Sequence, residues 1–166
     1  MNNTNQPPYE RFPTLLNEFI TLREIKESDL SLIREISYYD AIQAQTIEQA
    51  QEMQEKIMQD YSNGNSIHWG IIDNSKNIIV GTCGYYRGFK DMAGELGCVL
   101  LPASRGSGYM VSAMQLAIDF GLEQMKLKRI WAVTSQGNAK AIKLLLRLNF
   151  KEIKKLNDDE LEFELL

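Results

Sequence analysis

The sequence predicts a single domain of the mixed α/β class, with a mostly antiparallel, twisted sheet that carries helices on both faces. Three observations lead to this prediction. Strand-like segments at 66–72, 77–86 and 94–101 follow one another across short polar turns, which is typical of hairpins. A glycine turn then leads from the last of these segments into a long helical pattern. The length of 166 residues, with 44% hydrophobic and 24% charged residues, suits one globular core.

The first elements follow a polar start. Residues 1–12 are polar and contain Pro7 and Pro8, so we expect a flexible N-terminus and a domain spanning residues 13–166. The alternating segment 19–23 predicts a first strand. Ser28 is then expected to cap a helix that runs to about residue 36.

A second helix is predicted from Thr46 to about Tyr61, because Thr46 and Gln49 form a capping-box pattern. Its apolar residues make a narrow stripe: Ile47, Ala50, Met53, Ile57 and Met58. Further along, 128–134 reads as a strand between two helices. The last helix should run from Asn138 to Asn149, since asparagine tolerates the left-handed backbone that often ends a helix. A final hairpin is expected over residues 150–166.

The glycine turn at Gly106 and Gly108 is the most informative stretch. Two glycines one residue apart allow a ligand to approach the backbone closely. The helix that follows presents Met110, Met114, Ala117, Ile118, Gly121 and Met125 at helical spacing. The amides of residues 105–110 precede or begin this helix, so they and the helix dipole favour an anion, above all a phosphate.

Three kinds of phosphate site use such a turn. A phosphate-binding loop of an NTPase needs a lysine after the last glycine, and none follows Gly108. A dinucleotide site needs a third small residue, where Val111 stands, and an acidic residue after the next strand, where 135–137 has none. The third kind is an acyl-CoA site, in which the pyrophosphate lies on these amides.

The third kind fits best by resemblance. Arg105-Gly-Ser-Gly-Tyr-Met110 resembles the pyrophosphate-binding turn of the GNAT superfamily of acyl-CoA N-acyltransferases. The segment 94–102 resembles the preceding strand of its Rim-type branch, which acetylates ribosomal-protein N-termini and other amines. Asn138-Ala-Lys-Ala141, at the start of the last helix, resembles the Asn-x-x-Ala/Ser motif of the family. The resemblance covers roughly residues 19–155 and implies the GNAT fold, with a sheet splayed at the CoA site.

The resemblance also implies an activity and its site. Acetyl-CoA would be the co-substrate, without a metal, and a primary amine of a protein N-terminus or a small molecule would attack it directly in a ternary complex. Glu95 is the candidate general base, although it could instead be paired with Arg87. The implied CoA-binding residues are Cys98, Val99, Leu100, Arg105, Gly106, Ser107, Gly108, Tyr109, Met110, Asn138, Lys140 and Lys143. In the family, a bulge in the central strand frees the amides that meet the pantetheine arm.

Two positions depart from the family pattern. Ala103 stands where Gln or Arg is usual, and Leu145 replaces the tyrosine that protonates the leaving thiolate. Water, Ser135 or another tyrosine could take over that proton transfer. These departures keep a second hypothesis open, namely a CoA-binding sensor or interaction module without transferase activity.

The charge of the sequence limits the kinds of partner that the protein can bind. The net charge is −4, which argues against general nucleic-acid binding. Residues 101–150 carry seven basic and two acidic groups, a net +5, which leaves −9 for the rest. This asymmetry suits a phosphate-rich cofactor on one side and a cationic acceptor on the other. We expect a monomer or homodimer.

The cellular context follows from simple absences in the sequence. The N-terminus lacks the basic start and apolar run of a signal peptide, and no apolar stretch is long enough to cross a membrane. Cys83 and Cys98 cannot form a disulfide framework, so they should be reduced, possible neighbours across a hairpin. A cytoplasmic protein is therefore predicted. His68, the single histidine, is expected to be a packed residue without an assigned role.

Overall fold

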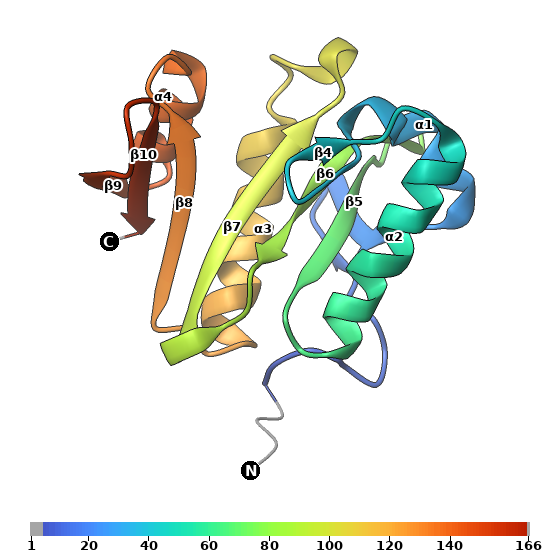
Figure 1. Ribbon diagram of the computed structural model, residues 1–166, viewed down its shortest axis with the longest axis horizontal. Helices are drawn as coiled ribbons and strands as arrows, with labels where there is room; N and C mark the ends of the chain where they lie inside the picture. The colour runs from blue at the N-terminus through green and yellow to red at the C-terminus, as the bar shows by residue number, and fades with distance from the viewer. Residues whose placement is uncertain (1–4, 166) are drawn as a thin grey trace.

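An eight-stranded sheet runs through the computed structural model, which describes residues 5–165 (Figure 1). Its strands lie in the order β1-β2-β5-β6-β7-β8-β10-β9, and β3 pairs with β4 in a separate hairpin. The strand bounds are β1 Leu15–Leu16, β2 Ile20–Glu24, β3 Tyr38–Tyr39, β4 Ile42–Gln43, β5 Ile67–Asp73, β6 Ile78–Tyr86, β7 Ala93–Leu100, β8 Arg129–Ser135, β9 Phe150–Lys155 and β10 Glu160–Leu165.

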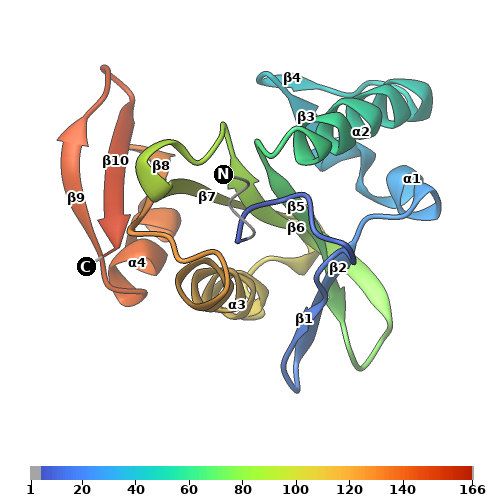
Figure 2. The same cartoon turned by 90° about the horizontal axis from the view of Figure 1, so that it is seen from below.

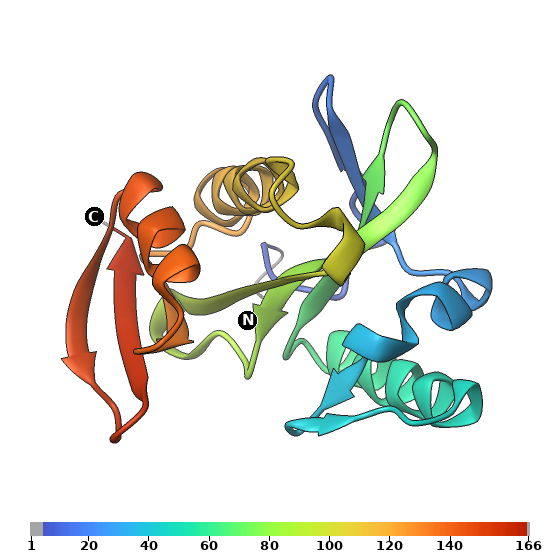
Figure 3. The ribbon, with the colours of Figure 1, turned by 90° about the horizontal axis from the view of Figure 1, so that it is seen from above.

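The helices lie on both faces of this sheet. Their bounds are α1 Leu30–Ile33, α2 Ile47–Ser62, α3 Tyr109–Glu123 and α4 Ala139–Arg147, with short 3₁₀ turns at Glu27–Asp29, Arg34–Ile36, Lys90–Met92 and Pro102–Ser104. Viewed along the sheet, α3 and α4 cover one face, while α1, α2 and the β3–β4 hairpin cover the other (Figures 2 and 3). The predicted class, a mixed α/β domain with a mostly antiparallel sheet, is confirmed.

The splay of the sheet is located at the one parallel pair of strands. β7 and β8 pair only between Ala93–Glu95 and Arg129–Trp131, after which β7 continues to Leu100 and β8 to Ser135 without pairing (Figure 1). Beyond Glu95, the edge of β7 that faces β8 therefore has no neighbouring strand. Its backbone groups on that edge are left free to bind a ligand.

The prediction of a bulge in β7 is wrong. β6 and β7 pair in unbroken register from Gly81 opposite Leu100 to Tyr86 opposite Glu95. The nearby shift of register lies instead between β5 and β6, next to Ile71 and Ile72. The sheet opens because β8 leaves β7 early and stays paired with β10 on its other side.

The core lies mainly between the sheet and α3. Four residues of the apolar stripe predicted for this helix are buried within it: Met114, Ala117, Ile118 and Gly121. Met110 is half-buried, and Met125 is buried just beyond the helix end. Tyr85 reaches from β6 to donate a 2.6 Å hydrogen bond to the carbonyl of Ala117. This contact satisfies the one polar atom of a fully buried ring, so the helix is held to the sheet by packing and by a hydrogen bond.

The helix starts agree with the predictions only in part. Ser28 caps nothing: a 3₁₀ turn already begins at Glu27, and the Asp29 carboxylate accepts the Lys26 amide at 2.8 Å. Thr46 does cap α2, since its hydroxyl accepts the Gln49 amide at 3.1 Å. The end of the last helix is as predicted, with Asn149 in the left-handed region at φ 70°.

Part of the predicted flexible N-terminus lies against the core. Gln6 donates a 3.0 Å hydrogen bond to the Met125 carbonyl, and the Tyr9 amide donates one of 3.0 Å to the Tyr61 hydroxyl. The Tyr9 ring also meets the edge of Phe120, with ring centroids 5.8 Å apart. Residues 1–4 of that segment lie outside the described residues.

Candidate active site

The glycine turn has the backbone that its sequence suggests. Gly106 and Gly108 adopt φ values of 80° and 84°, and Gly108 immediately precedes the first residue of α3. A Cβ atom at Gly108 would meet nothing closer than the Phe19 ring at 4.0 Å. Position 108 therefore excludes side chains through its left-handed backbone, and the space beside the helix start is open to a ligand.

The start of α3 is anchored from two neighbouring turns. The buried Tyr109 side chain points away from the open space, donates its hydroxyl to the Asp73 carboxylate and stacks on Phe19, with ring centroids 4.9 Å apart. Asn17 donates a 2.8 Å hydrogen bond to the Ser112 hydroxyl. The Tyr109 hydroxyl, followed by the amide of Lys76, holds the pKa of Asp73 well below its usual range. Asp73 is therefore a carboxylate at neutral pH.

A cavity of about 730 Å³ opens where β7 and β8 separate. Nine of the twelve predicted CoA-binding residues line it: Cys98, Val99, Leu100, Arg105, Gly106, Gly108, Met110, Asn138 and Lys140. Ser107, Tyr109 and Lys143 do not. We call this space the β7–α4 cavity. Its charged lining residues are Arg105, Lys140 and Arg147, all basic, which is the electrostatic setting that a polyphosphate needs.

Sequence reasoning missed four lining residues: Val111, Ala141, Leu144 and Arg147. Helical spacing would have found two of them, because Leu144 and Arg147 lie four and seven residues after Lys140 and so share its face of α4. Lys143 lies on the exposed side of that helix.

Asn138 is an ordinary helix cap here. Its side-chain oxygen accepts the Ala141 amide at 3.1 Å, while its NH₂ group has no hydrogen-bond partner among residues 5–165. That NH₂ group is available to a ligand in the β7–α4 cavity. Leu145, at the usual tyrosine position, is buried in the core and lines neither cavity.

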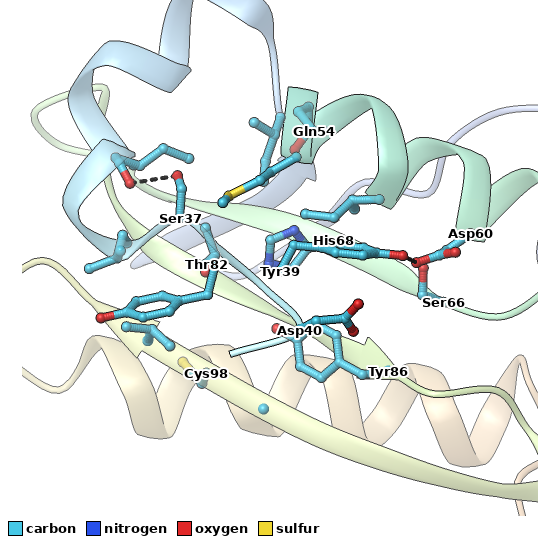
Figure 4. Close-up of a pocket in the computed structure, with 18 of the residues that line it drawn as sticks. Ser37, Tyr39, Asp40, Gln54, Asp60, Ser66, His68, Thr82, Tyr86 and Cys98 are labelled. Atoms are coloured by element: carbon cyan, nitrogen blue, oxygen red, sulfur yellow. Dashed lines mark hydrogen bonds between the residues drawn. The ribbon is translucent and has the colours of Figure 1, made fainter. Parts of the chain in front are cut away.

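A second cavity, of about 770 Å³, lies on the other face of the sheet, beneath α1, α2 and the β3–β4 turn (Figure 4). We call it the α2 cavity. One part of its wall is apolar: Ile25, Leu30, Ile33, Ile36, Ala50, Met53 and Ile57. The charged residues of its wall are Asp40, Asp60, Glu95 and Arg87, so carboxylates outnumber cations three to one. Cys98 and Val99 line both cavities, which therefore meet at this point of β7.

Glu95 lies in the wall of the α2 cavity and is paired. Its side chain is 10% exposed, and both of its oxygens accept from one guanidinium nitrogen of Arg87, whose side chain is 72% exposed. The hydrogen bond to Glu95 raises the pKa of Arg87. Glu95, the candidate base, is thus also the residue that forms the expected ion pair with Arg87. On β8, its neighbour in the last paired position is Trp131.

Tyr86 and His68 form the floor of the α2 cavity. Their ring centroids lie 5.7 Å apart, and a Cβ at Gly97 would come within 2.6 Å of the Tyr86 ring, so glycine is required there. Burial raises the pKa of Tyr86 well above its usual range and lowers that of His68 to about 4. Both side chains are therefore neutral at physiological pH.

The two cysteines face each other, as the hairpin suggested. Cys83 on β6 is directly opposite Cys98 on β7, and both are free thiols. The hydrogen bond with Cys83, together with burial, raises the pKa of the Cys98 thiol well above its usual range. Cys98 is therefore protonated where the two cavities meet.

The described residues contain neither a metal-binding cluster nor a membrane-spanning helix. Within residues 5–165, no three His, Cys, Asp or Glu side chains gather closely enough to hold a metal ion. None of the helices in that range has both the length and the apolar composition needed to cross a membrane.

Comparison with known proteins agrees with this geometry. The chain is 30% identical over 155 residues to the uncharacterized N-acetyltransferase p20 of Bacillus licheniformis, covering 89% of this chain and 87% of that protein. It is 27% identical over 149 residues to the uncharacterized N-acetyltransferase YoaA of Bacillus subtilis, covering 85% and 84%.

Solved structures share the fold. A GNAT-family acetyltransferase from Bacillus anthracis superposes with a TM-score of 0.77 at 22% identity, covering 93% of this chain and 98% of that one. A mutant of the spermidine N-acetyltransferase SpeG from Vibrio cholerae gives 0.78 at 18% identity, covering 90% and 95%. Residues 20–151 match the acetyltransferase (GNAT) domain, and the chain therefore belongs to the GNAT family of acetyl-CoA-dependent N-acetyltransferases.

Proposed function

We propose that this enzyme transfers the acetyl group of acetyl-CoA to the primary amine of a cationic small molecule or of a protein N-terminus, by direct attack in a ternary complex. The observation that carries this proposal is the meeting of two oppositely charged cavities at Cys98 and Val99. The basic β7–α4 cavity suits the phosphates of CoA. The acidic α2 cavity suits an amine that arrives as an ammonium ion.

On the CoA side, the pyrophosphate would lie on the amides of residues 105–110 at the start of α3. A phosphate there gains hydrogen bonds and a favourable helix dipole at little reorganisation cost. Arg105, Lys140 and Arg147 would neutralise its remaining charge. The free edge of β7 at Cys98–Leu100 would pair with the amides of the pantetheine arm, with the Asn138 side chain nearby. Lys143 would contribute only its positive charge. Ser107 would contribute only as a residue of the glycine turn.

On the acceptor side, Glu95 would act as the general base, directly or through one water. The arriving ammonium first loses one proton to Glu95, which releases it to solvent. The neutral amine then attacks the thioester carbonyl carbon, the C–N bond forms, and the C–S bond breaks. The second amine proton passes to Glu95, and the CoA thiolate takes up a proton as it leaves. With Leu145 in place of tyrosine, water would supply that proton. Much of the rate would come from holding both reactants together.

The charge of the α2 cavity limits the range of candidate acceptors. Asp40, Asp60 and Glu95 against the single Arg87 favour a cation. The structural neighbours described as spermidine N-acetyltransferases fit a small polyamine, whereas the Rim-type resemblance of residues 94–102 fits a protein N-terminus. Both are primary amines, so the reaction is the same.

Two measurements test the proposal. Isothermal titration should show acetyl-CoA binding, and a thiol-release assay over amines and N-terminal peptides should show turnover. Failure to bind at high micromolar concentration would reject the CoA site. Binding without turnover above background would favour the alternative, a CoA-binding sensor module, which Leu145 and the paired state of Glu95 support.

A further inference from the structure

We infer that the α2 cavity contains a second acceptor subsite, formed by Asp60 and Ser66 with His68 farther along the same wall, which binds an ammonium group of the acceptor remote from the amine that is acetylated. This inference rests on the proposed function, because it assigns the α2 cavity to the acceptor. It goes beyond it by requiring two cationic groups on one acceptor molecule.

Two buried polar atoms are the first observation. Ser66 is 6% exposed, and its hydroxyl has no hydrogen-bond partner among residues 5–165. The Nδ1 atom of His68, two residues along on β5, is likewise buried and unpaired within that range. Both residues line the α2 cavity. Buried polar atoms are nearly always satisfied in folded proteins, so two neighbouring orphans indicate a group that arrives from the cavity.

A carboxylate beside these atoms is the second observation. The Asn65 amide donates a 2.8 Å hydrogen bond to the Asp60 carbonyl, which brings the end of α2 next to Ser66. Figure 4 shows the Asp60 carboxylate and the Ser66 hydroxyl together at one end of the cavity, with the Tyr39 ring reaching the same place. The Tyr39 hydroxyl donates to Asp60 at 2.9 Å, which fixes the position of that carboxylate.

The charges of the groups around this end of the cavity favour a cation. His68 is neutral because of its burial, so it adds an acceptor nitrogen and no positive charge. Asp40 projects from the β3–β4 turn toward the same end of the cavity (Figure 4), which adds a second carboxylate. Lys56 lies over the face of the Tyr39 ring, with its nitrogen 5.5 Å from the centroid, and no ion pair joins it to Asp60 among the described residues. An anion would meet two carboxylates here, whereas an ammonium would be bound by Asp60 and Ser66, with the neutral His68 farther along the same wall (Figure 4).

The position of the subsite decides what it does. Figure 4 shows Cys98, where the cavities meet, at the end opposite Asp60 and Ser66. Glu95 lies opposite Tyr86, and the neighbouring Tyr85 pairs with Ile67, so the base is level with Ser66 and two strands across from it. An acceptor held at Asp60 by one ammonium group can therefore extend its other amine across the cavity, past Glu95, toward Cys98. The subsite favours α,ω-diamines over monoamines of the same length.

The test compares 1,4-diaminobutane, 4-amino-1-butanol and butylamine at saturating acetyl-CoA, with thiol release as the readout. We expect kcat/KM to be about tenfold to hundredfold higher for the diamine, the range expected for one charge-assisted hydrogen-bonded contact. Asp60→Asn keeps the size of the side chain and should remove most of this preference by raising KM for the diamine alone. Ser66→Ala should remove part of it.

Asp158→Asn, on the exposed turn between β9 and β10, changes the net charge equally and should leave the preference intact. Thermal midpoints would verify that both variants remain folded. Equal kcat/KM for diamine and butylamine, or an equal loss for both in Asp60→Asn, would overturn the subsite while leaving the acetyltransferase proposal standing. Turnover only with a neutral N-terminal peptide would also overturn it. Absence of turnover with every acceptor would reject the proposed function and the subsite together.

Discussion

The Tyr109 hydroxyl donates a hydrogen bond to the Asp73 carboxylate, which joins the first residue of α3 to the turn between β5 and β6. The same carboxylate accepts the Ser75 amide at 2.8 Å and the Lys76 amide at 2.9 Å. One side chain thus orders a hairpin turn and fixes the helix end whose amides would bind the pyrophosphate. Tyr109 contributes to that site by positioning, since its ring points away from the β7–α4 cavity.

Removing this hydroxyl should therefore weaken CoA binding without changing the chemistry. For Tyr109→Phe we expect the dissociation constant for CoA to rise about threefold to tenfold, the scale of one hydrogen bond, with kcat unchanged. S-acetylpantetheine, which lacks the pyrophosphate, is the matched control and should show no change in KM. An equal loss with both thioesters would mean that Tyr109 only supports the fold.

The same pair predicts a dependence of stability on pH. The folded-state pKa of Asp73 is held below its unfolded value of about 3.9, so it stabilises the fold above that pH and loses this effect as the pH falls through the folded-state pKa. Tyr109→Phe removes the largest cause of the shift. The difference in unfolding midpoint between parent and variant should be full at pH 6 and shrink below pH 4. A constant difference from pH 6 to pH 3 would contradict this account.

Gly108 can be tested against a glycine with the same strain. Gly108→Val forces a β-branched residue into a left-handed backbone, at a cost of about 1–2 kcal/mol, and directs a side chain into the space beside the helix amides. We expect CoA binding to be abolished. Gly88→Val is the control, because Gly88 has a similar φ of 83°. The nearest atom to a Cβ there would be Asn65 Oδ1, at 3.9 Å, so a side chain has room. This variant should lower the thermal midpoint similarly and keep parental CoA affinity; loss of affinity in both would reject the phosphate-cradle proposal.

The local motifs could be predicted because they depend on neighbours in sequence. The αL residues Gly108 and Asn149, the Thr46 cap and the strand pairs follow from backbone conformation and short-range patterns. The Asp29 interaction at the first helix start was missed although it is local: its carboxylate accepts the Lys26 amide three residues back and pairs with Arg23 six residues back. Lysine is not among the residue types that usually cap a helix, so the capping rule selected Ser28 instead of Lys26.

The acceptor side was unpredictable because its residues come from elements that meet only in the folded chain. Asp60 comes from the last turn of α2, Ser66 precedes β5, and Asp40 lies in a tight turn between two short strands. Nothing in their spacing relates them. They converge because α2 folds back over the sheet, and a polar residue at the end of a helix reads in sequence as a solvated one.

Glu95→Gln tests the general base. The substitution keeps the shape of the side chain and leaves an oxygen for Arg87, so the fold should be preserved. We expect kcat to fall roughly 10²-fold, the scale of a lost general base, with KM for acetyl-CoA nearly unchanged. The limb of the pH profile that depends on this base should disappear. A variant as fast as the parent at neutral pH would remove Glu95 from the mechanism.

Substitution of Arg87 is expected to improve acceptor binding, whereas substitution of Glu95 should slow the reaction. In the free enzyme its guanidinium occupies both oxygens of Glu95, where an incoming ammonium would bind. Because the Arg87 side chain is 72% exposed, water screens the pair and the amine has little to displace. Arg87→Met should lower KM for a cationic amine by up to about fivefold, the limit for an exposed ion pair.

The same variant should lower the thermal midpoint, because a nearly buried carboxylate loses its partner. Arg87→Lys, which keeps the charge, should resemble the parent in both measurements. If Arg87→Met instead raises the acceptor KM or lowers kcat as far as Glu95→Gln does, then Arg87 holds the acceptor or aims the base. The ion pair would in that case be part of the working site rather than a contact that the acceptor replaces.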